Sequence, residues 1–241
     1  MQDITFRSLL ASYRRDKMAE ELAGEWGVAL LYRPIALALV APLARTRVSP
    51  LAVTLSGLAL LPLMPGIALL VQPDSAFAWV CGLSVLYCIV DCADGSLARL
   101  QRRETLSGWY IDLSGDLLYR VTVYASLGYL TNVLTGSHGS WIALALLAAW
   151  LALFARVARL YGELLVTRGM GSSTNGAETS TRSIIKNIHM ALSGLDGLFP
   201  LLALAAWWYG QFTVFWWWIL VYSAADALYS HLLTWSRVRS C

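Results

Sequence analysis

Charged side chains are scarce in this sequence of 241 residues, where they make up 14% against 58% apolar side chains. A soluble domain typically carries about 25% charged residues, so water is not the main solvent of this chain. In lipid, helices satisfy their own backbone hydrogen bonds. The composition therefore predicts an all-α integral membrane protein, and the net charge of +3 is too small to indicate a nucleic acid partner.

Cysteine is also rare, with four residues in the chain. Cys81, Cys88 and Cys92 lie inside one apolar segment and Cys241 ends the sequence, which excludes a disulfide framework or a zinc-binding spacing. Residues 1–25 are rich in charge and lack the short apolar core of a secretory signal. We therefore expect them to stay in the protein.

Six apolar segments are long enough to cross a membrane as helices. They lie near residues 50–71, 77–101, 105–133, 140–167, 188–209 and 213–235. The connections at 72–76, 135–139 and 210–211 hold no Lys or Arg, whereas the opposite connections and the N-terminus are basic. The positive-inside rule therefore predicts that both ends of the chain lie in the cytoplasm.

A further apolar segment, 28–44, is short for a span and contains Arg33, Pro34 and Pro42. Crossing would place the charged N-terminus outside, so we expect this segment to lie along the cytoplasmic membrane surface as an interfacial amphipathic helix. The prediction divides the chain into an N-terminal cytoplasmic or interfacial helical segment, 1–48, and a six-helix transmembrane catalytic domain, 49–241. Residues 169–181, rich in Gly, Ser and Thr, predict a flexible cytoplasmic loop.

Four carboxylates lie within two of the apolar segments, at Asp91, Asp94, Asp112 and Asp116. Spacings of three and four residues place each pair on one face of its helix. Only the short basic turn 102–104 separates the two helices, so they must be antiparallel neighbours. At about 1.5 Å rise per residue, the four carboxylates meet at matched depths, roughly 10–15 Å from that turn.

Carboxylates crowded in a low-dielectric site repel one another unless a cation lies between them. Hard divalent ions prefer oxygen ligands, so the pattern predicts bound Mg²⁺ or Mn²⁺, with two ions plausible.

Small residues share the helix faces of these carboxylates. Gly95 and Ala98 lie beside Asp94, and Gly108 lies on the face of Asp112. They leave room for a flat base and ribose, although close helix packing explains the glycines equally well. Arg99 is placed either to contact a pyrophosphate oxygen or to neutralise a neighbouring aspartate.

The pattern resembles the signature of the CDP-alcohol phosphotransferases, D-x2-D-G-x2-A-R-x8-G-x3-D-x3-D, which covers 26 residues here. Every fixed position is matched, by Asp91, Asp94, Gly95, Ala98, Arg99, Gly108, Asp112 and Asp116. The expected layout, an interfacial N-terminal helix and six spans with a cytoplasm-facing site, is also similar to that of the family. Pro50 and Thr54 resemble the family's Pro-Asn-x-x-Thr entry to the first span, with Leu51 in place of the Asn.

The resemblance implies that Asp91, Asp94 and Asp112 hold the metal ions and that Asp116, also near the metals, acts as general base. The acceptor hydroxyl would attack the β-phosphorus of the donor, and CMP would leave. The residues implied around the cytidine diphosphate group are Gly95, Ala98, Arg99, Gly108 and, through the partial match, Thr54. The resemblance also implies a homodimer, and small residues such as Gly128 and Ser126 are candidate contacts.

Further charges fall at the same depth in other apolar segments, which predicts a hydrated cavity. They are Arg156, Arg159, Asp196 and Asp226, with Glu163 at a shallower position. We expect Arg156 and Arg159, together with Arg120, to bind an anionic group such as a phosphate on the acceptor. The alternative is internal pairing, for example of Arg159 with Glu163.

CDP-diacylglycerol is the favoured donor and a small polyol or phosphorylated alcohol the favoured acceptor, because a membrane lipid reaches such a site laterally between helices. A water-soluble CDP-alcohol acting on a lipid acceptor is the alternative within the class. A divalent-cation transporter would explain the aspartates, but it gives no role to Gly95, Ala98, Arg99 and Gly108. A non-catalytic binding module is a third possibility, against which the intact set of aspartates counts.

Overall fold

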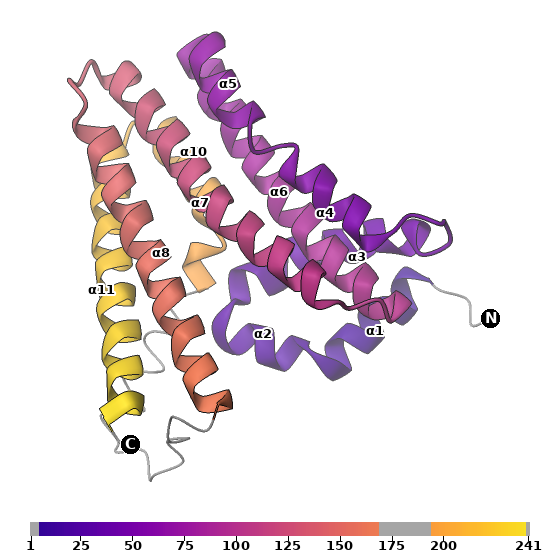
Figure 1. Cartoon of the computed structure of the whole chain (residues 1–241). Helices are drawn as coiled ribbons and strands as arrows, with labels where there is room; N and C mark the ends of the chain where they lie inside the picture. The colour runs from indigo at the N-terminus through magenta and orange to yellow at the C-terminus, as the bar shows by residue number, and fades with distance from the viewer. Residues whose placement is uncertain (1–4, 169–193, 240–241) are drawn as a thin grey trace.

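The computed structural model describes residues 5–168 and 194–239, and this part of the chain is helical with no β-strand. Figure 1 shows the helices as one bundle with three short N-terminal helices at its lower end. The α-helices are α1 (Phe6–Asp16), α2 (Met18–Gly24), α3 (Arg33–Leu43), α4 (Pro50–Leu58), α5 (Leu63–Leu70), α6 (Pro73–Gln101), α7 (Leu106–Thr135), α8 (Ser140–Thr167), α10 (Phe199–Trp208) and α11 (Phe212–Arg239). A π-helical turn, η1 (Val28–Tyr32), leads into α3.

The first predicted span is interrupted, because α4 ends at Leu58 and α5 begins at Leu63. Pro62 has no backbone N–H to donate and its ring crowds the carbonyl one turn earlier. The chain therefore turns through shorter bonds, from Leu60 N to Gly57 O and from Leu61 N to Leu58 O. The predicted span near 50–71 is nevertheless found as the helical stretch Pro50–Leu70, with a tighter turn in its middle.

The hairpin of α6 and α7 matches the predicted antiparallel pair. Arg102 ends α6 in the left-handed conformation, with a φ of 53°, and Arg103 N donates to Ala98 O at 2.9 Å. This satisfies the last carbonyls of the helix. Thr105 then caps α7, since its hydroxyl accepts a hydrogen bond from Gly108 N. The two caps hold the aspartate-bearing ends of the helices side by side.

The core lies where α6 and α7 meet the C-terminal helices. Phe77, Val123, Leu127 and Trp216 are fully buried there, and Trp216 Nε1 donates to Thr131 Oγ1 at 3.1 Å. The helices α8 and α11 pack along one another, and α7 packs against α8. This arrangement places α7 between the motif helix α6 and the charged face of α8.

The small residues Gly128 and Ser126 lie inside this packing. A Cβ at Gly128 would lie 2.6 Å from Ala145 Cβ of α8, and Ser126 is buried. The interpretation of these two residues as contacts of a homodimer is therefore wrong, because α8 of the same chain covers Gly128.

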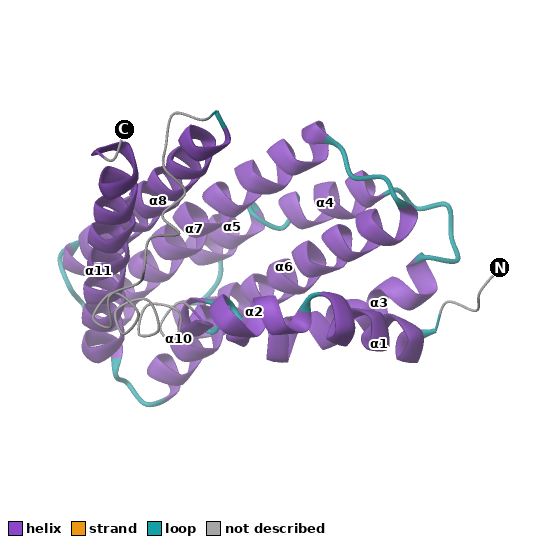
Figure 2. Cartoon of the chain, turned by 90° about the horizontal axis from the view of Figure 1, so that it is seen from below, coloured by secondary structure: helices purple, strands orange, loops and turns teal. Residues whose placement is uncertain are grey.

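The N-terminal segment consists of three short helices, and the predicted interfacial segment 28–44 forms the π-helical turn η1 followed by α3. Figure 2 shows α1, α2 and α3 together along one side of the molecule. In α3, Ala36 and Val40 are buried against the motif helix α6 in a second apolar cluster that includes Ala93 and Leu97. The motif helix is therefore held from behind by the N-terminal segment.

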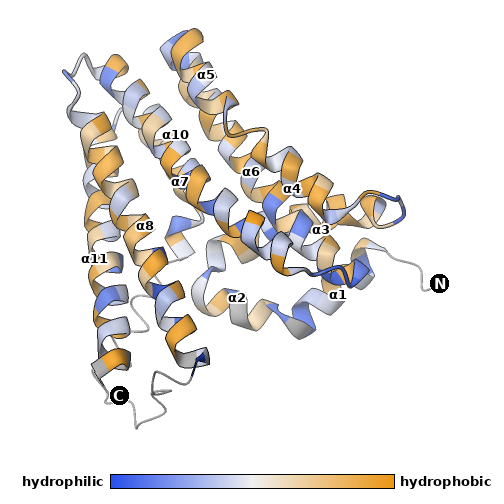
Figure 3. Ribbon diagram, viewed as in Figure 1, coloured by the Kyte–Doolittle hydropathy of each residue, from blue (hydrophilic) through white to orange (hydrophobic). Residues whose placement is uncertain are grey.

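Among residues 5–168 and 194–239, three helical stretches are long and apolar enough to cross a membrane, Pro50–Leu70, Pro73–Gln101 and Ser140–Leu165. Apolar residues dominate these stretches, whereas hydrophilic residues gather toward the end of the bundle near α1 and α2 (Figure 3). The described part of the chain is thus all-helical, and these apolar stretches indicate a membrane protein. Part of the predicted span 188–209 and the whole predicted loop 169–181 lie outside the described residues.

Candidate active site

Three of the four predicted carboxylates line one small pocket between facing helices. Asp91 and Asp94 come from α6 and Asp112 from α7, and the space between them is about 10 Å³. This is close to the room that one water molecule needs. Thr54 of α4 lines the same pocket, and its hydroxyl faces Asp94.

Asp91 and Asp112 lie within hydrogen-bonding reach of one another across the α6 and α7 interface. Two carboxyl groups in contact inside an apolar bundle need a proton or a cation between them. The oxygen-only set of Asp91, Asp94 and Asp112 suits a hard divalent ion. Within the part of the chain that the structure describes, no three His, Cys, Asp or Glu side chains are already arranged around a metal position.

A glycine brings the two motif helices and α4 together at this pocket. A Cβ at Gly115 would lie 2.9 Å from Leu58 Cδ2 and 3.0 Å from Tyr87 Oη. Tyr87 in turn stacks on Tyr119, with ring centroids 4.4 Å apart. The close approach of α7 to its neighbours therefore depends on the missing side chain at Gly115.

A much larger cavity, of about 600 Å³, adjoins the small pocket. Asp91 and Asp112 line both spaces, whereas Asp94 lines the small pocket and Asp116 the large cavity. The carboxylates therefore form a row that leads from one space to the other. The remaining charged residues on the cavity wall are Lys17, Glu25, Arg33, Arg120, Arg156, Arg159, Asp196 and Asp226.

Asp116 faces guanidinium groups rather than the other carboxylates. Its Oδ2 lies 3.4 Å from Arg156 Nη2 of α8, and its Oδ1 lies 3.9 Å from Arg120 Nε on its own helix. The side chain is about 29% exposed to the cavity. An acceptor held at these arginines would lie next to the Asp116 carboxylate.

Two of the three predicted acceptor-binding arginines are already paired. Arg120 Nη2 lies 2.5 Å from Asp196 Oδ2. Arg159 Nη1 lies 2.5 Å from Asp226 Oδ1 and 2.7 Å from Ser230 Oγ. The alternative of internal pairing is thus correct in kind for Arg159, but its partner is Asp226 of α11 and not Glu163.

Arg156 differs from the other two arginines because it has unused donor capacity. Its only ion pair in the described residues is the 3.4 Å contact with Asp116, and its buried Nε has no hydrogen-bond partner there. An unpaired buried donor costs about 1–3 kcal/mol. Arg156 is therefore the guanidinium best able to accept an anionic ligand in the cavity.

The remaining motif residues lie nearer the α6 to α7 turn and line neither space. Arg99 folds back over Gly95, where a Cβ would lie 3.6 Å from Arg99 Nη1. No carboxylate among residues 5–168 and 194–239 forms an ion pair with Arg99. A Cβ at Gly108 would lie 3.1 Å from Thr105 Oγ1, and Ala98 is half-buried. Arg99 is therefore available to an anion.

The sequence profile of the CDP-alcohol phosphatidyltransferases matches residues 47–180, more than half of the chain. The chain belongs to the CDP-alcohol phosphatidyltransferase family. No curated protein matches the chain. As a member of this family, the protein is a transferase of substituted phosphate groups that moves a phosphoalcohol from a CDP-alcohol. The family works in phospholipid biosynthesis and generally depends on divalent metal ions.

Some cavity residues carry no local signal in the sequence. Lys17 and Arg33 reach the cavity from the N-terminal segment, which the predicted boundary at residue 48 separates from the catalytic domain. Tyr87 and Tyr119 are single aromatic residues in apolar helices, where a packing role is the ordinary interpretation. Only the three-dimensional packing brings these residues to the site.

Proposed function

We propose that this transferase moves a phosphatidyl group from CDP-diacylglycerol to the hydroxyl of a small anionic alcohol, depends on Mg²⁺ or Mn²⁺, and releases CMP. The observation that carries the proposal is the row of carboxylates, in which Asp91 and Asp112 line both the small pocket and the arginine-lined cavity. A cation held by Asp91 and Asp112 would lie next to an acceptor bound in the large cavity.

Asp91, Asp94 and Asp112 are the proposed metal ligands, with Asp116, which lines the adjoining cavity, as a proposed fourth. Their contact across the helix interface is relieved when a cation neutralises it. A bound divalent ion, or two, would offset the charge of the pyrophosphate as CMP leaves.

Asp116 is the proposed general base. It faces the large cavity, so its carboxylate can accept the proton of the acceptor hydroxyl. The acceptor oxygen then forms a bond to the β-phosphorus of the donor, and the bond from that phosphorus to the bridging oxygen of CMP breaks. Arg99, free of a carboxylate partner in the described part of the chain, is placed to stabilise the negative charge on the departing phosphate. Gly95, Ala98, Gly108 and Thr54 would shape the nucleotide pocket.

Arg156 is the proposed ligand of an anionic group on the acceptor, with Arg120 and Arg159 holding its surroundings in place through Asp196 and Asp226. Guanidinium groups match the geometry of phosphate oxygens. The position of Arg156 opposite Asp116 would bring the acceptor hydroxyl to the base. A phosphorylated alcohol is therefore favoured over a neutral polyol.

A lipid donor is favoured by the outer surface of α7. Trp109, Tyr110 and Leu118 are more than half exposed on this helix, which also carries Asp112 and Asp116. Exposed apolar side chains beside the site offer diacylglycerol chains a path from the bilayer. We also propose six spans, with the site facing the cytoplasm and with α3, whose Ile35 and Leu39 are exposed, resting on the inner leaflet.

The proposal is tested by incubating purified protein with Mg²⁺ or Mn²⁺, a panel of CDP donors and a panel of alcohols with and without a phosphate group. We expect CMP release with CDP-diacylglycerol and a phosphorylated acceptor. If CMP were released only from water-soluble CDP-alcohols, the donor would be a CDP-alcohol of that kind and not CDP-diacylglycerol. Metal flux into liposomes without any CMP release would show that the protein is a transporter and would contradict the proposed enzyme function.

A further inference from the structure

The N-terminal segment contains a buried ion pair, and one of its two residues also bonds to the motif helix α6. Glu21 of α2 and Arg33 of α3 form a bidentate contact, with Arg33 Nη2 to Glu21 Oε1 at 2.6 Å and Arg33 Nε to Glu21 Oε2 at 3.1 Å. Tyr13 of α1 donates a third bond to Glu21 at 2.8 Å. Both charged side chains are less than 10% exposed. A buried pair of this kind is stable only with its hydrogen bonds satisfied.

The free end of Arg33 reaches into the motif itself. Arg33 Nη1 donates to the carbonyl oxygen of Cys92 at 3.0 Å and to Ser96 Oγ at 3.2 Å. Cys92 lies between the two aspartates of α6, and Ser96 follows Gly95. The contact therefore falls on the turn of helix that carries Asp91 and Asp94.

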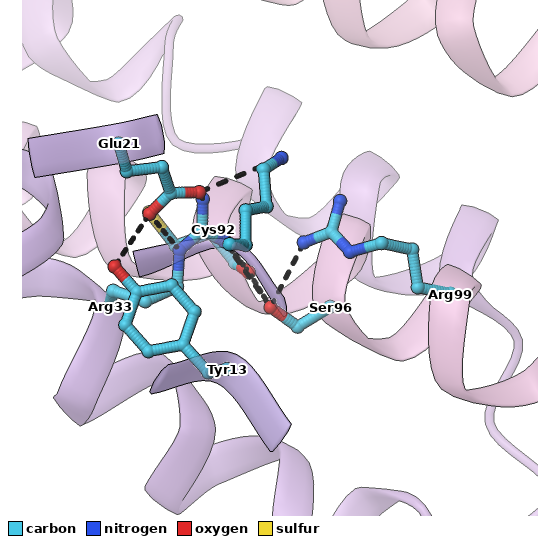
Figure 4. A network of polar contacts seen from close by, with 7 residues as sticks. Tyr13, Glu21, Arg33, Cys92, Ser96 and Arg99 are labelled. Atoms are coloured by element: carbon cyan, nitrogen blue, oxygen red, sulfur yellow. Dashed lines mark hydrogen bonds and ion pairs between the residues drawn. The ribbon is translucent and has the colours of Figure 1, made fainter. Parts of the chain in front are cut away.

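Ser96 is shared by two guanidinium groups. Its hydroxyl accepts from Arg33 and, at 3.5 Å, from Arg99 Nη2, and it donates to Cys92 O at 2.8 Å. Figure 4 shows Ser96 between the two arginines, with Glu21 on the far side of Arg33. Because two like charges meet at one oxygen, the negative charge of Glu21 is needed to keep Arg33 there.

From this geometry, we propose that Glu21, Arg33 and Ser96 form a positioning relay for Arg99. The relay holds the Arg99 guanidinium over Gly95, ready for the pyrophosphate of the donor. The N-terminal helices thus belong to the donor site although they lie outside the matched residues 47–180. This inference rests on the proposed role of Arg99 in donor binding.

The relay predicts an effect on the donor and not on the acceptor. The Ser96→Ala variant loses the oxygen on which the two arginines converge, so we expect the KM for the CDP donor to rise roughly fivefold. The KM for the acceptor should stay within about twofold of the original value. Ser96→Thr keeps a hydroxyl and should restore the donor KM.

Ser114→Ala is the matched control. Ser114 lies between the aspartates of α7, and its hydroxyl donates to Tyr110 O at 2.8 Å, the same backbone bond that Ser96 makes to Cys92. Neither guanidinium of the relay contacts Ser114 in the described structure. Its removal should leave both KM values unchanged.

A double-mutant cycle decides whether Ser96 acts through Arg99. Arg99→Ala should raise the donor KM by about tenfold or more, and adding Ser96→Ala to it should cause no further rise. The positioning relay is overturned if the two effects multiply, or if Arg99→Ala raises the donor KM while Ser96→Ala and Glu21→Gln do not. An unchanged donor KM in Arg99→Ala would instead overturn the proposed donor site and the relay with it.

Discussion

Arg156 Nη2 lies 3.4 Å from Asp116 Oδ2, across the cavity between α8 and α7. The buried Nε of the same arginine has no partner in the described residues, whereas Arg120 and Arg159 each hold an aspartate at 2.5 Å. Three arginines that look equivalent in the sequence therefore have different roles. One is available to a ligand, and two maintain the cavity wall.

Replacing Arg156 by Gln should raise the KM for the acceptor by about tenfold or more, because a charge-assisted bond contributes roughly 1.5–3 kcal/mol. The KM for the donor should change little. Steady-state CMP release at varied acceptor concentration measures both. Arg168→Gln, at an exposed arginine where α8 ends, is the control. An unchanged acceptor KM in Arg156→Gln would remove Arg156 from the acceptor site.

Replacing Arg159 by Met should lower the stability, because it removes the ion pair between Arg159 and the nearly buried Asp226 carboxylate. Arg159 is about one third exposed, so solvent screening limits the loss to about 1–2 kcal/mol. The melting temperature measured in detergent should fall by about 3–6 °C. The double variant Arg159→Met with Asp226→Leu should recover most of that loss, and a double variant as unstable as the single one would argue against pairing.

The Gly95→Ala variant should fold normally and bind the donor poorly. The added Cβ would meet Arg99 Nη1 at 3.6 Å, which is an ordinary contact. It would, however, occupy the space beside Gly95 in which the base and ribose of the donor are expected to lie. We expect the donor KM to rise by about tenfold. Gly82→Ala is the control on the same helix, since nothing lies within 4 Å of a Cβ there. Equal donor KM values for the two variants would remove Gly95 from the donor site.

Glu21 predicts a pH dependence of stability. Burial raises the pKa of Glu21, but the hydrogen bonds and charge of Arg33 outweigh it and hold the pKa below its usual value. A carboxyl group whose pKa is lower in the folded than in the unfolded protein stabilises the fold at pH values above its unfolded pKa, which is about 4.3 for Glu. This stabilisation is lost as the pH falls through the pKa that the group has in the folded protein. The difference in melting temperature between the original protein and Glu21→Gln should therefore be constant near neutral pH and shrink below about pH 4. A difference that stays the same down to pH 3 would contradict this account.

Sequence reasoning located the carboxylates because their spacing is local. Asp91, Asp94, Asp112 and Asp116 sit on two helices joined by a short turn, so helix geometry alone predicted that α6 and α7 face each other. The break at Pro62 carried a signal too, since proline lacks the N–H that a helix interior requires.

The partners of the arginines could not be predicted from the sequence, because they depend on packing between helices that are distant along the chain. Arg159 finds Asp226 across 67 positions, and Arg33 finds Ser96 across 63. A spacing rule selected Glu163 as the neighbour of Arg159, and the packing of α8 against α11 supplied a better one. The prediction that Gly128 is a homodimer contact was wrong for the same reason. A small residue suits a contact between helices of one chain as well as a contact between two chains.

Metal-dependent CMP release tests the central claim most directly. Purified protein is stripped with a chelator, mixed with CDP-diacylglycerol and a phosphorylated alcohol, and titrated with Mn²⁺ or Mg²⁺. The account predicts no CMP without metal, saturable release on addition of either ion, and loss of that release in Asp91→Asn and Asp112→Asn variants that still fold. Full CMP release from the stripped protein, or from the folded Asp112→Asn variant, would contradict it.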